Sequence, residues 1–176
     1  MKCGVLMIRL FFLIGLPGSG KSTLANALLT DCPDRALIAT DKIRLDLYGD
    51  EAIQGDWLQV WQEVGRQFRE AARQIQQDER SVAIYDATNV VRRQRREAIA
   101  LARQSGFTHI TGIWLNTPLW LCLQHTQQRD RQVPPDVIQR MSRCLQGAPP
   151  SRLEGFNGLI KIRGWELETG ESIIDL

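Results

Sequence analysis

The sequence predicts an α/β domain in which a parallel sheet of about five strands lies between helices on both faces. Runs rich in β-branched and aromatic residues alternate along the 176 residues with stretches whose apolar residues recur at three- and four-residue steps. This alternation is typical of parallel strands joined by crossover helices. A glycine-rich stretch between the first predicted strand and the first predicted helix is the second observation, because it indicates where a ligand binds.

The glycine-rich stretch is Gly15-Leu16-Pro17-Gly18-Ser19-Gly20-Lys21-Ser22, followed by Thr23, and it matches G-x-x-x-x-G-K-[ST] at every position. Glycines allow backbone N–H groups to turn inward around a phosphate, the lysine brings positive charge to the β- and γ-phosphates, and the serine hydroxyl suits Mg²⁺. A predicted strand over 8–14 precedes it and a predicted helix over 22–29 follows, which argues against a turn that matches by chance. We therefore expect a three-layer P-loop NTPase fold that binds ATP and Mg²⁺ through Gly15, Pro17, Gly18, Ser19, Gly20, Lys21, Ser22 and Thr23.

The rest of the chain continues the alternation, as one domain over 1–176 with a helical lid over about 125–145. Strands are predicted over 35–39, 81–85, 107–115 and 158–163. Helices are predicted over 42–48, 56–77, 92–104 and 117–128, with another helix ending near 144. Thr117 is the predicted N-cap of the helix that reaches 128, with Pro118 in its first turn.

The sequence argues against a secreted protein and against a membrane-spanning protein. The net charge of +2 permits a phosphate-rich partner without requiring one. An N-terminal signal peptide is not expected because Arg9 interrupts the apolar run, and no other stretch approaches the length of a membrane span. Cys3, Cys32, Cys122 and Cys144 show no metal-ligand spacing, so we expect free thiols, no disulfide partner and a reducing cytoplasm. No oligomeric state is predicted.

Asp41 follows the second predicted strand, and Arg44 comes three residues later. Ligands of parallel sheets bind at the carboxyl ends of the strands, so both residues are candidates for the site. Asp41 would act as a general base for an acceptor hydroxyl, and Arg44 would hold an acceptor phosphate or carboxylate. The alternative is that Asp41 caps the following helix and pairs with Arg44.

Asp86 follows the third predicted strand and is itself followed by Ala87, Thr88 and Asn89. An acid at this position could orient water on Mg²⁺, and Thr88 and Asn89 add neutral hydrogen-bonding groups for the substrate. A cluster that caps the next helix is the alternative interpretation, and the two are compatible.

Three further patterns have both a functional and a structural interpretation. Arg129 and Arg131, between two predicted helices, could close a lid over ATP or could be solvated surface residues. Arg92, Arg93, Arg95 and Arg96 could contact a nucleic-acid backbone, but their spacing divides them around the helix. The predicted helix over 56–77 carries an apolar stripe, which we interpret as the face that packs into the core, although its tryptophans could also stack on bases. The stripe consists of Trp57, Val60, Trp61, Val64, Phe68, Ala71 and Ile75.

In combination, these motifs resemble the P-loop kinases of the polynucleotide 5′-hydroxyl kinase-like group over nearly the whole chain. The resemblance rests on residues 15–23, 40–44, 85–89, 129–134, 137–141 and 154–156, in that order. It implies that Asp41 is the general base, that Arg44 contacts acceptor phosphate, that Asp86 lies on the acceptor side, and that Arg129 and Arg131 contact ATP phosphates.

The first functional hypothesis is therefore an ATP- and Mg²⁺-dependent kinase acting on a polynucleotide 5′-hydroxyl. Kinases of small metabolites, kinases of aminoacylated tRNA and zeta-type toxins that phosphorylate a sugar nucleotide share the same core, so the acceptor stays open. A nucleotide-dependent ATPase or switch without an acceptor is the alternative from another class.

Overall fold

A parallel five-stranded sheet organises the part of the chain that the computed structural model describes, which comprises residues 6–51, 53, 55–128 and 133–163. The strands lie in the order β2-β3-β1-β4-β5. Their bounds are Arg9–Ile14 (β1), Ala36–Ala39 (β2), Ala83–Asp86 (β3), His109–Leu115 (β4) and Gly158–Ile162 (β5). The predicted fold class is confirmed, because each neighbouring pair runs parallel and helices connect the strands.

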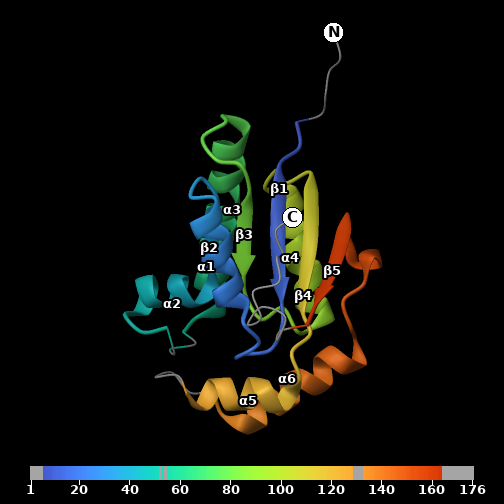
Figure 1. The fold of residues 1–176 in the computed structure, drawn as a ribbon. Coiled ribbons are helices and arrows are strands. Elements are labelled where there is room, and N and C mark those ends of the chain that lie inside the picture. Colours follow the sequence, from blue (N-terminus) through green and yellow to red (C-terminus); the bar gives the residue numbers. More distant parts are fainter. Residues whose placement is uncertain (1–5, 52, 54, 129–132, 164–176) are drawn as a thin grey trace.

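Helices cover both faces of this sheet (Figure 1). Their bounds are Lys21–Asp31 (α1), Thr40–Tyr48 (α2), Trp57–Gln76 (α3), Arg92–Gln104 (α4), Leu119–Gln127 (α5) and Pro135–Gly147 (α6), with a 3₁₀ turn over Arg152–Glu154 (η1). Helix α1 packs on one face through Leu24 and Ala25, whereas α3 and α4 pack on the other. Among the described residues, no helix combines the length and apolar character needed to cross a bilayer.

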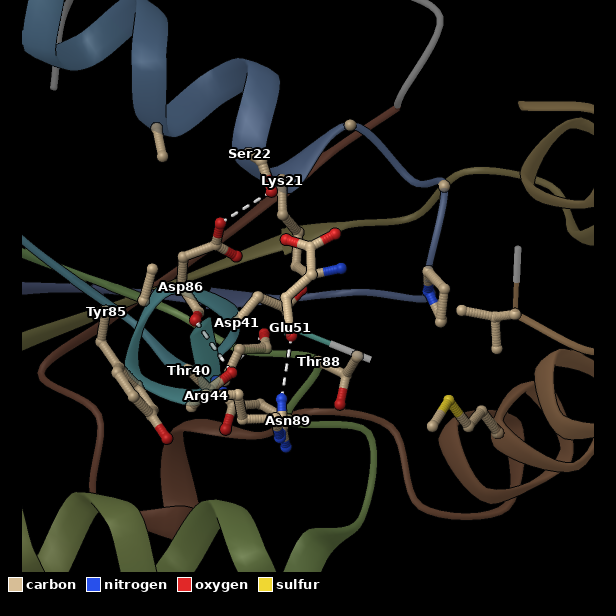
Figure 2. Close-up of a pocket in the computed structure, with 18 of the residues that line it drawn as sticks. Lys21, Ser22, Thr40, Asp41, Arg44, Glu51, Tyr85, Asp86, Thr88 and Asn89 are labelled. Atoms are coloured by element: carbon tan, nitrogen blue, oxygen red, sulfur yellow. Dashed lines mark hydrogen bonds and ion pairs between the residues drawn. The ribbon is translucent and has the colours of Figure 1, made fainter. Parts of the chain in front are cut away.

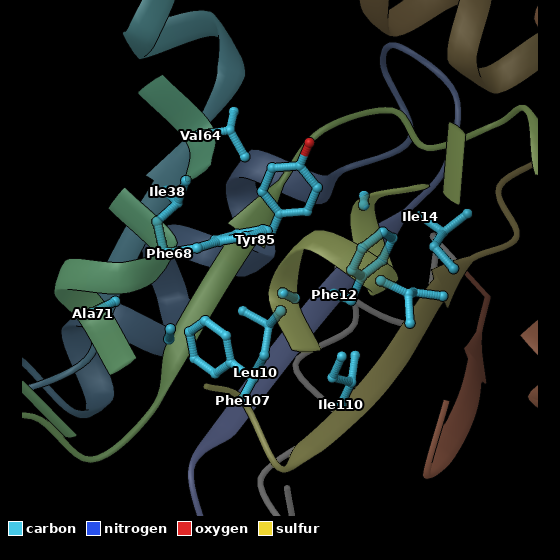
Figure 3. Close-up of a cluster of buried hydrophobic side chains, with 14 of the residues drawn as sticks. Leu10, Phe12, Ile14, Ile38, Val64, Phe68, Ala71, Tyr85, Phe107 and Ile110 are labelled. Atoms are coloured by element: carbon cyan, nitrogen blue, oxygen red, sulfur yellow. The ribbon is translucent and has the colours of Figure 1, made fainter. Parts of the chain in front are cut away.

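The central strand β1 is buried on both faces, as its apolar sequence predicts. Leu10, Phe12 and Ile14 face α3 and α4, while Phe11 and Leu13 face α1. On the α3 and α4 face, edge-on aromatic contacts link the strands to α3, as Figure 3 shows for Phe12, Tyr85 and Phe68. The sheet is therefore held rigidly from both sides, which fixes the positions of its strand ends.

The carboxyl ends of the strands lie at one edge of the sheet, and the arrowheads of β1, β3 and β4 in Figure 1 point toward this edge. The glycine-rich loop follows β1, and α2 begins directly after β2. The register pairs Ala39 with Asp86, so the start of α2 and the end of β3 lie side by side. Parallel pairing thus brings together three segments that are far apart in the sequence.

Two predicted helix starts differ from the structure by two residues. Helix α2 begins at Thr40 and not at residue 42, so Asp41 lies within its first turn. The prediction that Thr117 caps the next helix was wrong, because α5 begins at Leu119 and Pro118 occupies the N-cap without a side-chain hydrogen bond. The hydroxyl of Thr117 instead bonds to the glycine-rich loop.

Candidate functional site

The loop between β1 and α1 has the backbone shape that its glycines predict. Gly18 and Gly20 have φ angles of +77° and +97°, in the left-handed region that favours glycine. Gly20 is also the N-cap of α1, so the helix begins at Lys21 and its first N–H groups face the loop. The Gly15 N–H donates to the Thr88 carbonyl at 3.0 Å, which ties the loop to the segment after β3.

Residues of helix α5 and of the turn before it form hydrogen bonds to the backbone carbonyls of the loop. Thr117 Oγ1 donates to the Ser19 carbonyl at 2.8 Å, and His125 Nδ1 lies 2.9 Å from the Gly18 carbonyl oxygen. A Cβ on Gly18 would lie 2.4 Å from the Cys122 carbonyl oxygen. The sequence contained no local signal for these contacts, because they join residues about a hundred positions apart in the chain.

The Lys21 side chain folds back over the loop. Its Nζ donates to the Gly15 carbonyl at 3.0 Å and to the Leu16 carbonyl at 2.8 Å, and the residue is only 8% exposed. The ammonium group is thereby fixed where the motif requires positive charge for the β- and γ-phosphates. The fit of the loop to a nucleoside triphosphate follows from this charge together with the glycine geometry.

Ser22 and Asp86 meet at the mouth of the loop, where Ser22 Oγ donates to Asp86 Oδ2 at 2.9 Å (Figure 2). A hydroxyl and a carboxylate are hard oxygen donors that suit Mg²⁺. In the described part of the chain, no three His, Cys, Asp or Glu side chains gather as a metal site. A two-residue site still fits Mg²⁺ bound with a nucleotide, because waters and phosphates supply most of its ligands.

Asp41 and Arg44 lie in the first turns of α2. Arg44 Nη1 donates to Asp41 Oδ1 at 2.9 Å, as the i,i+3 spacing predicts. The N-cap of α2 is Ala39, so Asp41 does not cap the helix. The Asp41 side chain is 54% exposed, whereas that of Arg44 is 11% exposed and its buried Nε has no hydrogen-bond partner among the described residues.

Thr88 and Asn89 both line the cavity, and both also make structural hydrogen bonds to β1 or to the loop that follows it. Asn89 adopts a positive φ of 52°, is 7% exposed and donates from Nδ2 to the Leu13 carbonyl at 2.8 Å. The Thr88 carbonyl accepts the Gly15 N–H. The Asn89 side chain thus has a structural bond to the end of β1, which sequence reasoning did not anticipate.

One cavity of about 860 Å³ joins these groups. Lys21 and Ser22 line it together with Asp41, Arg44 and Asp86, and Figure 2 shows these side chains converging from separate elements. Val133, Val137 and Met141, from the segment predicted as a lid, also contribute to its lining. The tertiary structure therefore brings the predicted donor and acceptor residues to a common space.

Arg129 and Arg131, the predicted lid arginines, lie outside the described residues. Gln128 and Val133, on either side of that segment, line the cavity.

The basic cluster on α4 divides into one buried and three exposed residues. Arg95 is fully buried, and its guanidinium bonds bidentately to Glu154 at 2.7 and 2.9 Å. It also donates to the carbonyl oxygens of Asn89 and Val90. Contact of Arg95 with a nucleic acid is excluded by this burial, and its role is to fix the segment that follows Asp86.

Burial raises the pKa of two further groups near the site. The pKa of the Cys122 thiol rises to about 11, because the thiol is removed from water beneath the loop. The pKa of Tyr85, which precedes Asp86, also rises because its phenol is buried. Both groups are neutral at physiological pH, so neither adds charge to the cavity.

Comparison with known proteins supports this fold. The model of the family AAA_33, described as an AAA domain, matches residues 10–148. A chain of the Pnkp1/Rnl/Hen1 RNA repair complex is similar at 16% identity with a TM-score of 0.66; the match covers 83% of this chain and 46% of the other, less than half of its length. No curated protein sequence matches significantly.

Two further solved structures match over most of their length. A gluconokinase from Sinorhizobium meliloti has 16% identity and a TM-score of 0.55, with 87% of this chain and 81% of the gluconokinase covered. Kti12 from Chaetomium thermophilum, solved with ADP-AlF3, has 13% identity and a TM-score of 0.61, with 88% of each chain covered. At these identities the likeness establishes the fold.

Proposed function

The chain belongs to the AAA_33 family of AAA domains, and we propose that it is an ATP- and Mg²⁺-dependent kinase. In this proposal the γ-phosphoryl group passes to a hydroxyl acceptor, and the acceptor is the 5′-hydroxyl of a polynucleotide. The nucleotide-binding part follows from the P-loop fold, while the acceptor rests on the residues opposite the loop.

The observation that carries the proposal is the placement of Asp41 and Arg44 in the same cavity as Lys21 and Ser22. An ATPase without an acceptor needs room only for water beside its nucleotide, whereas this cavity extends from the P-loop to a carboxylate and a nearly buried guanidinium. Arg44 lines the cavity with its guanidinium bonded to Asp41. An Nη group of that guanidinium would donate to an oxygen of an acceptor phosphate.

The reaction follows from these positions. The Asp41 carboxylate takes the proton of the acceptor hydroxyl as its oxygen bonds to the γ-phosphorus, and the bond from that phosphorus to the bridging oxygen of ADP breaks. Lys21 holds the phosphates and offsets the charge on the departing ADP. Magnesium, when bound, neutralises phosphate charge, and Ser22 and Asp86 are the residues that would hold it.

In this proposal, residues 1–176 form one kinase domain with a lid over about 125–145. Arg129 and Arg131 would then reach the ATP phosphates from that lid and add positive charge at the transferring group. The apolar side chains of Val133, Val137 and Met141 in the cavity lining support a covering role, since they would exclude water from the reaction.

The experiment is transfer of labelled γ-phosphate from ATP to a short 5′-hydroxyl oligonucleotide. Asp41→Ala should lower kcat roughly 10²- to 10⁴-fold, the range for loss of a general base, with ATP binding unchanged. Asp46→Ala is the matched control, because Asp46 is an exposed aspartate of the same helix that does not line the cavity. Unchanged transfer by Asp41→Ala would exclude the base role, and ATP hydrolysis without a labelled acceptor would favour the switch hypothesis.

A small-molecule kinase is the second candidate, favoured by the similarity to a gluconokinase over 81% of that chain. Gluconate and related polyols are the acceptors to test. Salt separates the two candidates, because the many phosphate contacts of a polynucleotide backbone weaken steeply with ionic strength, whereas the binding of gluconate, which carries a single charge, weakens much less.

A further inference from the structure

Two tryptophans in the predicted apolar stripe of α3 are not fully buried. Val60, Val64 and Phe68 are fully buried, whereas Trp57 is 49% exposed and Trp61 is only partly buried. Both rings line the large cavity. Core packing therefore explains most of the stripe and leaves the exposed surface of these two rings without a structural role.

The two rings form a stacked pair. Their centroids are 5.7 Å apart and their planes differ by 28°. An i,i+4 pair on a helix lies on one side of it, so the two indoles present a common aromatic surface. Exposing such a surface in a cavity costs stability, because the same apolar area would be favourable if it were covered.

Hydrogen bonds between the end of α2 and the start of α3 fix the position of the tryptophan pair. The Tyr48 hydroxyl at the end of α2 accepts a hydrogen bond from the Asp56 N–H at 3.1 Å and lies 3.2 Å from Gln59 Oε1. Asp56 in turn caps α3 by accepting the Leu58 N–H at 2.9 Å. A Cβ on Gly55 would lie 2.3 Å from the Tyr48 ring, so close packing holds this junction. The first turn of α3 is thus ordered before any ligand binds.

The surroundings indicate what the pair would contact. Asp41 and Arg44 line the same cavity, and their helix α2 packs against α3. A ligand with its hydroxyl at Asp41 and a phosphate at Arg44 would share the cavity with both indoles, which are then available to the rest of that ligand. A flat ring suits a stacked aromatic surface, and single-stranded nucleic acids combine a flat base with a phosphate in every unit.

We propose that Trp57 and Trp61 form a stacking platform for a nucleobase of the acceptor, which makes the acceptor a single-stranded end of DNA or RNA. This inference rests on the proposed kinase function, because it takes the Asp41 and Arg44 side of the cavity as the acceptor side. Stacking is tolerant of base identity, so the platform predicts little sequence preference.

Trp57→Ala tests the platform, because Trp57 is the more exposed ring and its loss disturbs the core least. Trp57→Phe retains a stacking ring. Trp120→Ala is the matched control, since Trp120 is 66% exposed on α5 and does not line the cavity. The acceptors are a short 5′-hydroxyl oligonucleotide and the same chain with abasic units at its 5′ end.

Trp57→Ala should raise the KM for the base-bearing acceptor roughly 5- to 100-fold, as expected for one lost stacking contact, and should leave the KM for the abasic acceptor and for ATP unchanged. Trp57→Phe should stay near the wild type, as should Trp120→Ala. Equal KM values for the two acceptors in the wild type, or an unchanged KM in Trp57→Ala, would overturn the platform.

A binding measurement separates this inference from the proposed function. Titration of the oligonucleotide without ATP should quench tryptophan fluorescence in the wild type and much less in Trp57→Ala. Quenching without phosphoryl transfer would support the platform and overturn the kinase assignment. Transfer with identical quenching in both proteins would overturn the platform alone. Quenching by gluconate, with none by the oligonucleotide, would overturn the platform and favour a sugar-like acceptor.

Discussion

Glu154→Gln should destabilise the protein far more than its position in a short 3₁₀ turn suggests. Glu154 accepts two hydrogen bonds from Arg95, at 2.7 and 2.9 Å, and the side chains of the pair are 3% and 0% exposed. Glutamine keeps the size of the side chain and removes its charge. The guanidinium of Arg95 would then remain buried without a counter-ion.

The expected loss is about 3–5 kcal/mol in the free energy of unfolding, the range for a buried ion pair that loses one partner. That is a fifth or more of a typical domain stability of about 5–15 kcal/mol. For a chain of this length the melting temperature should fall by roughly 6–20 °C. Urea unfolding, followed by circular dichroism, measures the free energy directly.

Glu97→Gln is the matched control, because it breaks the Arg93–Glu97 pair, which has the same 2.9 Å contact but side chains that are 87% and 52% exposed. Its cost should stay below about 1 kcal/mol, since water screens exposed pairs. The double variant Arg95→Met with Glu154→Met should recover part of the lost stability, because it leaves no buried charge but removes the donor to the Asn89 and Val90 carbonyls. A loss below about 1 kcal/mol in Glu154→Gln would refute the reasoning.

Three other predictions concern the loop and its neighbours. Gly18→Ala should abolish ATP binding in calorimetry while the fold persists, because the new Cβ would lie 2.4 Å from the Cys122 carbonyl oxygen at a φ of +77°; unchanged affinity would contradict the role of the loop. Asp86→Asn should raise the Mg²⁺ concentration for half-maximal activity roughly 10- to 100-fold, because Asp86 would orient a ligand of the ion; an unaltered Mg²⁺ titration would remove Asp86 from the site. Iodoacetamide at pH 8 should label Cys144 quickly and Cys122 only after unfolding, because the pKa of the buried Cys122 thiol is about 11 and little thiolate is present; fast labelling of Cys122 in the folded protein, read by mass spectrometry, would show that the loop opens.

Local chemistry predicted the strands, most helices and the P-loop. Strand and helix periodicities and glycine-rich turns depend on residues a few positions apart, so they can be read directly from the chain. The same holds for the positions of Asp41 and Asp86, because each directly follows a predicted strand and parallel strands end at one edge. The i,i+3 pairing of Asp41 with Arg44 followed from helix geometry alone.

Contacts between segments that are far apart in the sequence decided the roles of the residues that local patterns assigned wrongly or left open. Arg95 has the same local sequence signature as its exposed neighbours, and only the approach of Glu154 across 59 positions makes it a buried structural residue. Thr117 precedes a proline and a helix, a pattern typical of an N-cap, yet its hydroxyl bonds to the Ser19 carbonyl 98 positions away. Periodicity assigned Trp57 to the core, but Trp57 is the first residue of α3 and its half-exposed side chain lines the cavity. Sequence patterns specify which face of a helix or strand is apolar. How much of that face the sheet covers depends on how all the elements pack together, so only the tertiary structure determines it.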